Sequence, residues 1–199
     1  MLTAQRVMMK ATELALTGEK VTMQNIVVND TNRDEFRDRL VRYFTDIIPL
    51  PPEVGIEERI SEVGMVCVEN GRIIGVATIA KVLIRQLGMD MWFYRTSVSP
   101  DHRHVDIARS LANDLYAHMD AQYEPGKGMP VGFFYLIEAE VLIRNLPHCV
   151  WPTTGAVFIG LDNMGRQRSI KYFTRAMLDD PWETSQRVVR QAVEQPRVM

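Results

Sequence analysis

The spacing of apolar and polar residues predicts a helix, a strand and a second helix in the first quarter of the chain. A helix is expected over residues 4–18, where apolar positions fall loosely on one side, and a strand over 21–28, which is rich in β-branched residues. Residues 31–34 read T-x-x-D, a pattern typical of a helix start. Apolar residues then recur at helical spacing over 36–48 until Pro49 ends the segment.

The middle of the chain predicts strands. Apolar runs over 65–68 and 72–84 flank Asn70-Gly71, and Asn-Gly between such runs is typical of a β-hairpin. Residues 91–98 are aromatic and β-branched and predict a central strand. An apolar stripe at helical spacing then predicts a helix over 106–121.

The second half completes one mixed sheet. The expected elements are a strand over 131–137, a hairpin of 156–161 and 169–174 around a turn at 162–165, and a terminal helix over 181–194. Strands 91–98 and 131–137 flank a helix and should be parallel neighbours joined by a right-handed crossover. The sequence therefore predicts a single α/β domain of mixed α+β type, with a central mixed, twisted sheet and helices on both faces.

Composition excludes some broad classes of function. The net charge is −2 and the pI about 6.1, so the chain as a whole is not attracted to nucleic acid or to anionic membrane. No stretch reaches the roughly 20 apolar residues of a membrane span. Cys67 and Cys149 are too few for a disulfide framework, which favours a reducing, cytoplasmic location. A homo-oligomer is compatible with these numbers.

The chemistry-bearing segment runs from Tyr94 to Leu111. A strand leads through Val98-Ser99-Pro100 into a polar loop and an amphipathic helix. The backbone N–H groups at such a helix start have no partner within the helix, and the helix dipole adds partial positive charge. The segment is therefore suited to bind an anion such as a pyrophosphate.

This segment resembles the acetyl-CoA motif of the GNAT N-acetyltransferase superfamily, in which V-x-P precedes R/Q-x-x-G-x-G/A and an apolar helix. Val98 and Pro100 match, Arg103 takes the R/Q place, and Ala108 takes the last small position. Asp106 stands where the family has its first glycine. Its side chain adds bulk and negative charge near a negative ligand, which should oppose binding.

The resemblance implies a diverged GNAT-like acyltransferase that takes acetyl-CoA as co-substrate. It implies that the backbone N–H of Val98 meets the thioester carbonyl oxygen. It also implies that the pyrophosphate lies on one loop and helix start, comprising Arg103, His104, Val105, Asp106, Ile107 and Ala108. His104 and Arg109 could offset part of the Asp106 charge.

The next strand carries candidate acid–base groups. Some GNAT enzymes that acetylate amino termini have a glutamate here and an asparagine five residues later, and Glu140 and Asn145 have that spacing. In the family the glutamate accepts a proton from the amine. Glu138 lies one pleat earlier and could serve instead, and solvated glutamates at a strand end are the alternative explanation. The family's usual tyrosine has no motif counterpart, which leaves Tyr172 or Tyr94 as proton donors.

The acceptor is not specified by the sequence. An amine on a small molecule, a peptide or a modified base would suit the chemistry. One alternative is a GNAT-fold binding or assembly protein without efficient catalysis, for which Asp106 is the evidence. Another is acyl or alkyl transfer to a nucleic-acid base, supported only by a basic run of Arg166, Arg168, Lys171 and Arg175, which a solvated strand face would also explain.

A metal or thiol site is not expected. His102 and His104 lie near Asp106, but no further ligand has a recognisable spacing, so no metal is predicted. His148 precedes Cys149, yet neighbours in sequence seldom face each other as nucleophile and base.

Overall fold

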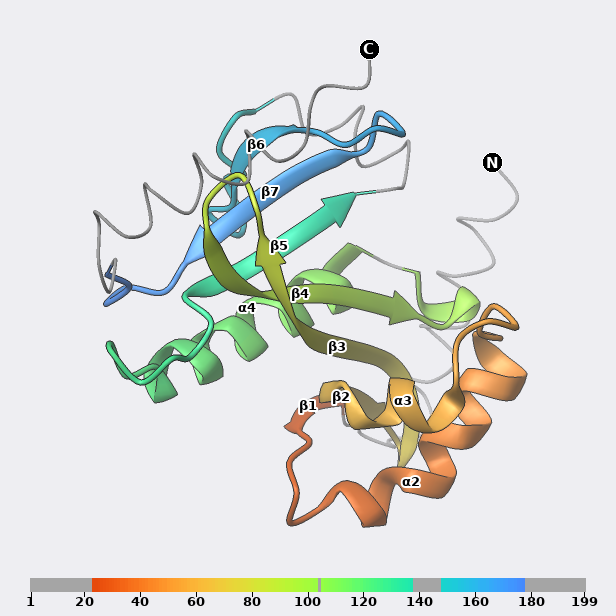
Figure 1. The fold of residues 1–199 in the computed structure, drawn as a ribbon. Coiled ribbons are helices and arrows are strands. Elements are labelled where there is room, and N and C mark those ends of the chain that lie inside the picture. Colours follow the sequence, from red (N-terminus) through yellow and green to blue (C-terminus); the bar gives the residue numbers. More distant parts are fainter. Residues whose placement is uncertain (1–22, 104, 138–147, 178–199) are drawn as a thin grey trace.

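The computed structural model describes residues 23–103, 105–137 and 148–177. Within these ranges seven strands form one sheet in the order β1-β2-β3-β4-β5-β7-β6 (Figure 1). The strands are β1 Met23–Val27, β2 Val63–Glu69, β3 Arg72–Ile84, β4 Met89–Val98, β5 Gly132–Ile137, β6 Val157–Leu161 and β7 Gln167–Tyr172. The helices are α2 Arg33–Arg42, the π-helix η1 Tyr43–Ile47, α3 Ile56–Ser61, the 3₁₀ turn η2 Pro100–His102 and α4 Val105–Gln122.

The strands from β2 to β4 form an antiparallel meander. β2 pairs with β3, and β3 pairs with β4 along its length from Gly75 opposite Val98 to Ile84 opposite Met89. The β2–β3 turn has Asn70 and Gly71 at positive φ, 48° and 79°, which is the two-residue turn that Asn-Gly predicts. The sequence-based hairpin is therefore confirmed.

β4 and β5 are parallel, and α4 is the crossover between them. Their register joins Trp92, Phe93 and Tyr94 to Phe133, Phe134 and Tyr135. All other strand pairs in the described sheet are antiparallel. This parallel pair confirms the predicted mixed sheet and the prediction that these two strands are parallel neighbours.

Helices cover both faces of the sheet. Ile107, Leu111 and Leu115 of α4 are buried on one face, while α2, η1 and α3 pack against β2 and β3 on the other. Arg33, at the start of α2, donates to the carbonyls of Ile60 (2.8 Å) and Val63 (3.0 Å) and so connects α2 to the end of α3. None of the helices in the described ranges combines the length and the apolar character that crossing a membrane requires.

The second helix differs from its expectation in two details. Its first helical residue is Arg33, and Asn32 rather than Thr31 takes the N-cap position, because the Thr31 hydroxyl donates to Asn29 Oδ1 (2.6 Å) and no side chain caps the helix. It widens into η1, where Ile48 N–H bonds to Tyr43 O (2.8 Å) across five residues. α3 was not predicted at all. The expected helices over 4–18 and 181–194 lie outside the described residues.

Packing at Gly132 yields a stability prediction. A Cβ at this position would run into the Lys171 carbonyl oxygen and the Tyr172 Cα of the neighbouring strand, which are backbone atoms that cannot rotate away. We therefore expect Gly132→Ala to lower the free energy of unfolding by about 3 kcal/mol, as overpacking of a rigid site does. Urea denaturation measures this change.

Gly55→Ala is the matched control. Gly55 has an ordinary φ of −67°, and its added Cβ would meet Glu58 Cβ at 3.7 Å, a normal contact. Its effect should stay within about 0.5 kcal/mol. Equal stabilities of the two variants would mean that β5 and β7 are farther apart than described.

Candidate functional site

A wedge opens between β4 and β5 beyond their three paired residues. β5 continues to Ile137 paired with β7, whereas β4 continues from Arg95 to Val98 with β3 as its partner on one side. Ser99 N–H donates to Ile74 O on β3 (2.8 Å), and the direction of backbone N–H groups alternates along a strand. The N–H of Val98 therefore points away from β3, towards the open side.

A chain of three side chains holds the loop that follows β4. Ser99 Oγ lies 2.7 Å from His102 Nδ1, and His102 Nε2 lies 3.0 Å from Glu69 Oε2 at the end of β2. Ser99 is buried, and His102 and Glu69 are about three-quarters buried. The contacts fix η2 against the β2–β3 hairpin and so set where α4 begins. His102 is thus engaged as a hydrogen-bonding residue.

The first turn of α4 packs tightly on the sheet. Ile107 is buried, and a Cβ on Gly75 of β3 would lie only 3.0 Å from the Ile107 side chain and 3.1 Å from Leu111. Glycine at position 75 thus allows the helix start to approach the sheet closely. Ala108 is half-buried, and Val105 is the first residue of the helix. His104 lies outside the described residues.

Asp106 lies on the solvent side of this turn. Its side chain is 79% exposed and forms an ion pair with Arg109, one helical turn later. Arg103, just before the helix, is also exposed. Burial raises the pKa of the Tyr43 phenol, and the Arg103 charge opposes that rise. The loop and helix start therefore present two arginines and one carboxylate beside the wedge.

No protein-family model and no curated protein matches this sequence. Solved structures do match its fold. An agmatine N-acetyltransferase superposes with a TM-score of 0.53 at 10% identity, covering 75% of this chain and 99% of its own. A proposed acetyltransferase from Salmonella typhimurium, solved with acetyl-CoA, superposes with a TM-score of 0.51 at 12% sequence identity. The match covers 80% of this chain and 98% of the Salmonella chain. A proposed acetyltransferase from Acinetobacter baylyi superposes with a TM-score of 0.50 at 12% sequence identity. The match covers 81% of this chain and 99% of the Acinetobacter chain. The chain has the GNAT acetyltransferase fold.

The GNAT-like fold separates the tyrosine candidates for proton transfer. Tyr172 pairs with Gly132 at the beginning of β5, whereas Val98 lies six residues beyond Trp92, about 20 Å along β4. The structure therefore does not bring Tyr172 to the wedge. Tyr94 is at the base of the wedge, but burial of its phenol raises the pKa of this group.

Tyr43 is a functional candidate that the sequence reasoning missed. Its hydroxyl lies 3.2 Å from Ser97 Oγ, beside Val98 on the open end of β4. Burial raises the pKa of Tyr43 to about 12, although the Ser97 hydrogen bond and the Arg103 charge act in the opposite direction. In the sequence Tyr43 lies on the apolar stripe of the second helix, seven residues after Phe36, and no motif distinguishes it from a core residue. Glu138 and Glu140 lie outside the described residues.

Most side chains of the basic run contact other residues of the same chain. Arg166 bonds to Asp162 (2.6 Å), in the turn before β7 rather than on the strand. The Lys171 ammonium lies 3.5 Å from the centre of the Tyr116 ring, and Arg175 donates to the Tyr123 carbonyl (2.5 Å). These partners support the interpretation of the run as part of a folded surface.

The cysteines and histidines do not form a recognisable thiol or metal site among the described residues. Cys67 is buried in β2, and both His148 and Cys149 are exposed on the segment before β6. Over the described ranges no three His, Cys, Asp or Glu side chains gather as metal ligands do.

The Ser99–His102–Glu69 chain predicts a cost for removing the imidazole. His102→Ala leaves the buried Ser99 hydroxyl and the Glu69 carboxylate without this partner, so the free energy of unfolding should fall by about 1–2 kcal/mol. Chemical denaturation gives the value. His118→Ala on α4 is the control, because no hydrogen bond or ion pair holds that imidazole among the described residues. A His102 variant as stable as the control would show that the loop does not depend on this chain.

Proposed function

We propose that the protein is an acyltransferase that moves an acetyl group from acetyl-CoA to a primary amine. The observation that carries the proposal is the N–H of Val98, which points into the wedge where β4 and β5 part. A backbone donor fixed in this way is suited to a carbonyl oxygen that gains negative charge during attack on a thioester. The solved neighbours with the same fold and acetyltransferase names support the assignment.

The residues at the start of α4 fit a pyrophosphate, with one opposing member. The first N–H groups of an 18-residue helix face the loop at Arg103, and the helix dipole favours an anion there. Arg103, His104 and the backbone of Val105 to Ala108 are the proposed contacts. Asp106 opposes binding, but its pairing with Arg109 reduces its effective charge. Acetyl-CoA would supply the activated acetyl group, and the wedge would hold the thioester.

The proposed proton transfers involve groups on both sides of the wedge. Glu140, or Glu138 two residues earlier, would take the proton from the attacking amine, since both follow β5 closely in the sequence. Tyr172, the sequence-based proton donor, lies at the far end of β5, so we do not assign it this role. The pair of Tyr43 and Ser97 is nearer to Val98 and offers a hydroxyl at the open end of β4.

The acceptor class is proposed as an amine on a small molecule, a peptide or a modified base. One neighbour of the same fold is named for an amine, agmatine, which supports an amine acceptor. The two-cysteine composition favours a cytoplasmic site of action, and a homo-oligomer is compatible with the fold. Nucleic acid is the less favoured acceptor, because three residues of the basic run have partners within the domain.

A second candidate function is a binding or assembly module that uses the GNAT fold without catalysis. Asp106 is the observation that favours it, because a carboxylate stands beside the proposed phosphate position. Calorimetric titration with acetyl-CoA separates the two functions. Saturable binding supports the transferase, and its absence, together with no transfer to a panel of amines, supports the module.

Removing the Asp106 charge should strengthen acetyl-CoA binding. Asp106→Gly removes a like charge near the pyrophosphate and releases Arg109 to pair with it, so the Kd should fall about fivefold, the equivalent of about 1 kcal/mol. Isothermal titration measures the affinity.

Asp30→Gly is the control for a simple change in net charge. Asp30 is exposed in the turn after β1, near the opposite end of β2 from the Glu69–His102 contact. Its replacement should leave the affinity unchanged. An unchanged or weaker affinity for Asp106→Gly would refute the alignment of this loop with the phosphates.

Glu140→Gln should lower turnover far more than it weakens acetyl-CoA binding. A positioned general base contributes about a hundredfold or more to the rate, whereas a solvated glutamate contributes almost nothing. Steady-state kinetics and the pH profile test this, since loss of the base should remove the acidic limb. Glu138→Gln is the matched variant. If it alone loses activity, Glu138 is the base, and if neither loses activity, the base is another group.

A further inference from the structure

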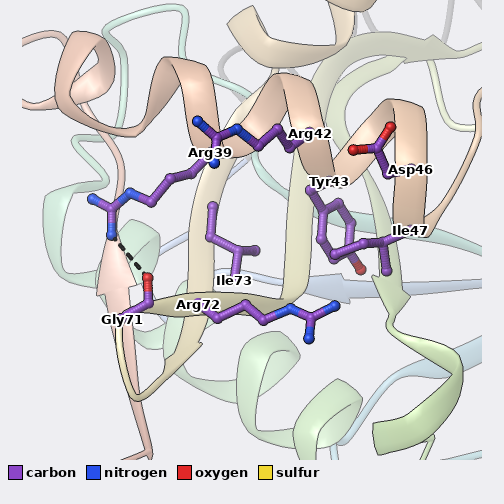
Figure 2. A pocket seen from close by; sticks show the side chains of 8 residues that line it. All are labelled: Arg39, Arg42, Tyr43, Asp46, Ile47, Gly71, Arg72 and Ile73. Atoms are coloured by element: carbon purple, nitrogen blue, oxygen red, sulfur yellow. Dashed lines mark hydrogen bonds between the residues drawn. The ribbon is translucent and has the colours of Figure 1, made fainter.

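A cavity of about 380 Å³ lies between the second helix and the β2–β3 hairpin, away from α4. Figure 2 shows helix residues on one side of it and the hairpin on the other. Its lining comprises Arg39, Arg42, Tyr43, Asp46 and Ile47 from α2 and η1, and Gly71, Arg72 and Ile73 from the hairpin. Three arginines and one aspartate give this lining a formal charge of +2.

One of the three arginines is already engaged. The Arg39 guanidinium donates to the Gly71 carbonyl (3.4 Å), lies 4.4 Å from the centre of the Phe36 ring, and is 3.7 Å from the Glu35 carboxylate. Arg39 therefore closes one end of the cavity by joining helix to hairpin, as Figure 2 shows.

Arg42 and Arg72 retain their full capacity to bind an anion. Among the residues that the structure describes, no hydrogen bond or ion pair holds either guanidinium. Asp46, the one acidic lining residue, accepts a hydrogen bond from Thr45 (2.9 Å) rather than pairing with either arginine. Two uncommitted guanidinium groups thus border a cavity whose wall includes the apolar side chains of Ile47 and Ile73.

The cavity adjoins the open end of β4 from the other face of the sheet. Tyr43 lines the cavity, and its hydroxyl contacts Ser97, the residue before Val98. The wall at Tyr43 is π-helical, a rare conformation found frequently at functional sites. α4 occupies the opposite face, so a ligand in the cavity and a phosphate at α4 would approach Val98 from different faces.

We propose that this cavity binds the anionic end of the acyl acceptor, a carboxylate or a phosphate monoester, through Arg42 and Arg72. The inference rests on the proposed transferase function and specifies its substrate class as an amine that also carries a negative charge. A planar guanidinium can donate two parallel hydrogen bonds to two oxygens of a carboxylate or to two oxygens of a phosphate monoester. The short apolar wall suits a small aliphatic stem between the anion and the amine.

The direct test is titration of the full chain with inorganic phosphate and with glutarate at low ionic strength. Arg42→Gln and Arg72→Gln should each weaken the binding of the preferred anion at least about fivefold, because each removes a charge-assisted contact. Arg85→Gln is the matched control. Arg85 is exposed in the β3–β4 turn, at the opposite end of β3, and should have no effect. Whichever anion binds with the lower Kd, phosphate or glutarate, identifies the acidic group of the acceptor as a phosphate or a carboxylate.

Acetyl-CoA titration of the same variants separates this inference from the proposed function. Anion binding that depends on Arg42 and Arg72, with unchanged acetyl-CoA affinity and a raised KM for acidic but not neutral amines, supports the inference. The inference is overturned if the chain binds neither anion, or if Arg85→Gln weakens anion binding as much as the other two variants do. Either result leaves the proposed transferase function open to support from acetyl-CoA binding. If both arginine variants weaken CoA but not dephospho-CoA, the cavity holds a phosphate of CoA, and the acceptor assignment is wrong.

If the wild-type chain binds phosphate or glutarate but not acetyl-CoA, the transferase proposal fails and the acceptor role of the cavity fails with it. The anion site itself then remains as a measured property. Thermal unfolding of each variant accompanies these titrations, and unchanged midpoints assign the losses to the removed charges rather than to misfolding.

Discussion

The structure depends on a three-residue parallel ladder between β4 and β5, which among the described strands is the pairing that joins β1–β4 to β5–β7. Aromatic rings reinforce the ladder. The ring centres of Tyr94 and Phe133 lie 5.6 Å apart in a stacked arrangement with an interplanar angle of 18°, and those of Tyr94 and Tyr135 lie 5.4 Å apart in a tilted one. On the other face of the sheet, the ring centres of Phe93 and Phe134 lie 5.5 Å apart. Because the ladder ends at Tyr94, β4 and β5 part beyond it, and the wedge exists only while these rings hold the strands together.

The two faces of the sheet contribute differently to the site. On one face, Gly75 allows the start of α4 to approach the sheet, so that a helix terminus lies beside the open end of β4. On the other face, Tyr43 connects η1 to Ser97. The loop between them is fixed by Ser99, His102 and Glu69. The position of Val98 is therefore constrained from both faces and from the loop, which is the rigidity that a fixed backbone donor needs.

Most of the fold could be predicted because its signals are local. Asn70-Gly71 set the hairpin, and the periodicity of 106–121 set α4 to within a residue at each end. α3 escaped because its six residues carry only two apolar positions and are held by a distant partner, Arg33. Only part of the site could be predicted from the sequence, because some of its residues are far apart along the chain. The loop motif at Val98 and Arg103 is contiguous, whereas Tyr43 and Ser97 are 54 residues apart and meet only in the folded sheet.

The topology of the ladder also orders the assembly of the domain. β2, β3 and β4 are consecutive strands joined by tight turns, so they can pair as soon as each turn forms. The β4–β5 pairing must wait until the whole connection of residues 99–131, including α4, has folded back onto the sheet. We expect the meander to be the early folding unit and the wedge to be the last feature to form. A chain that stalls before this closure would retain most of its secondary structure and lack its site entirely.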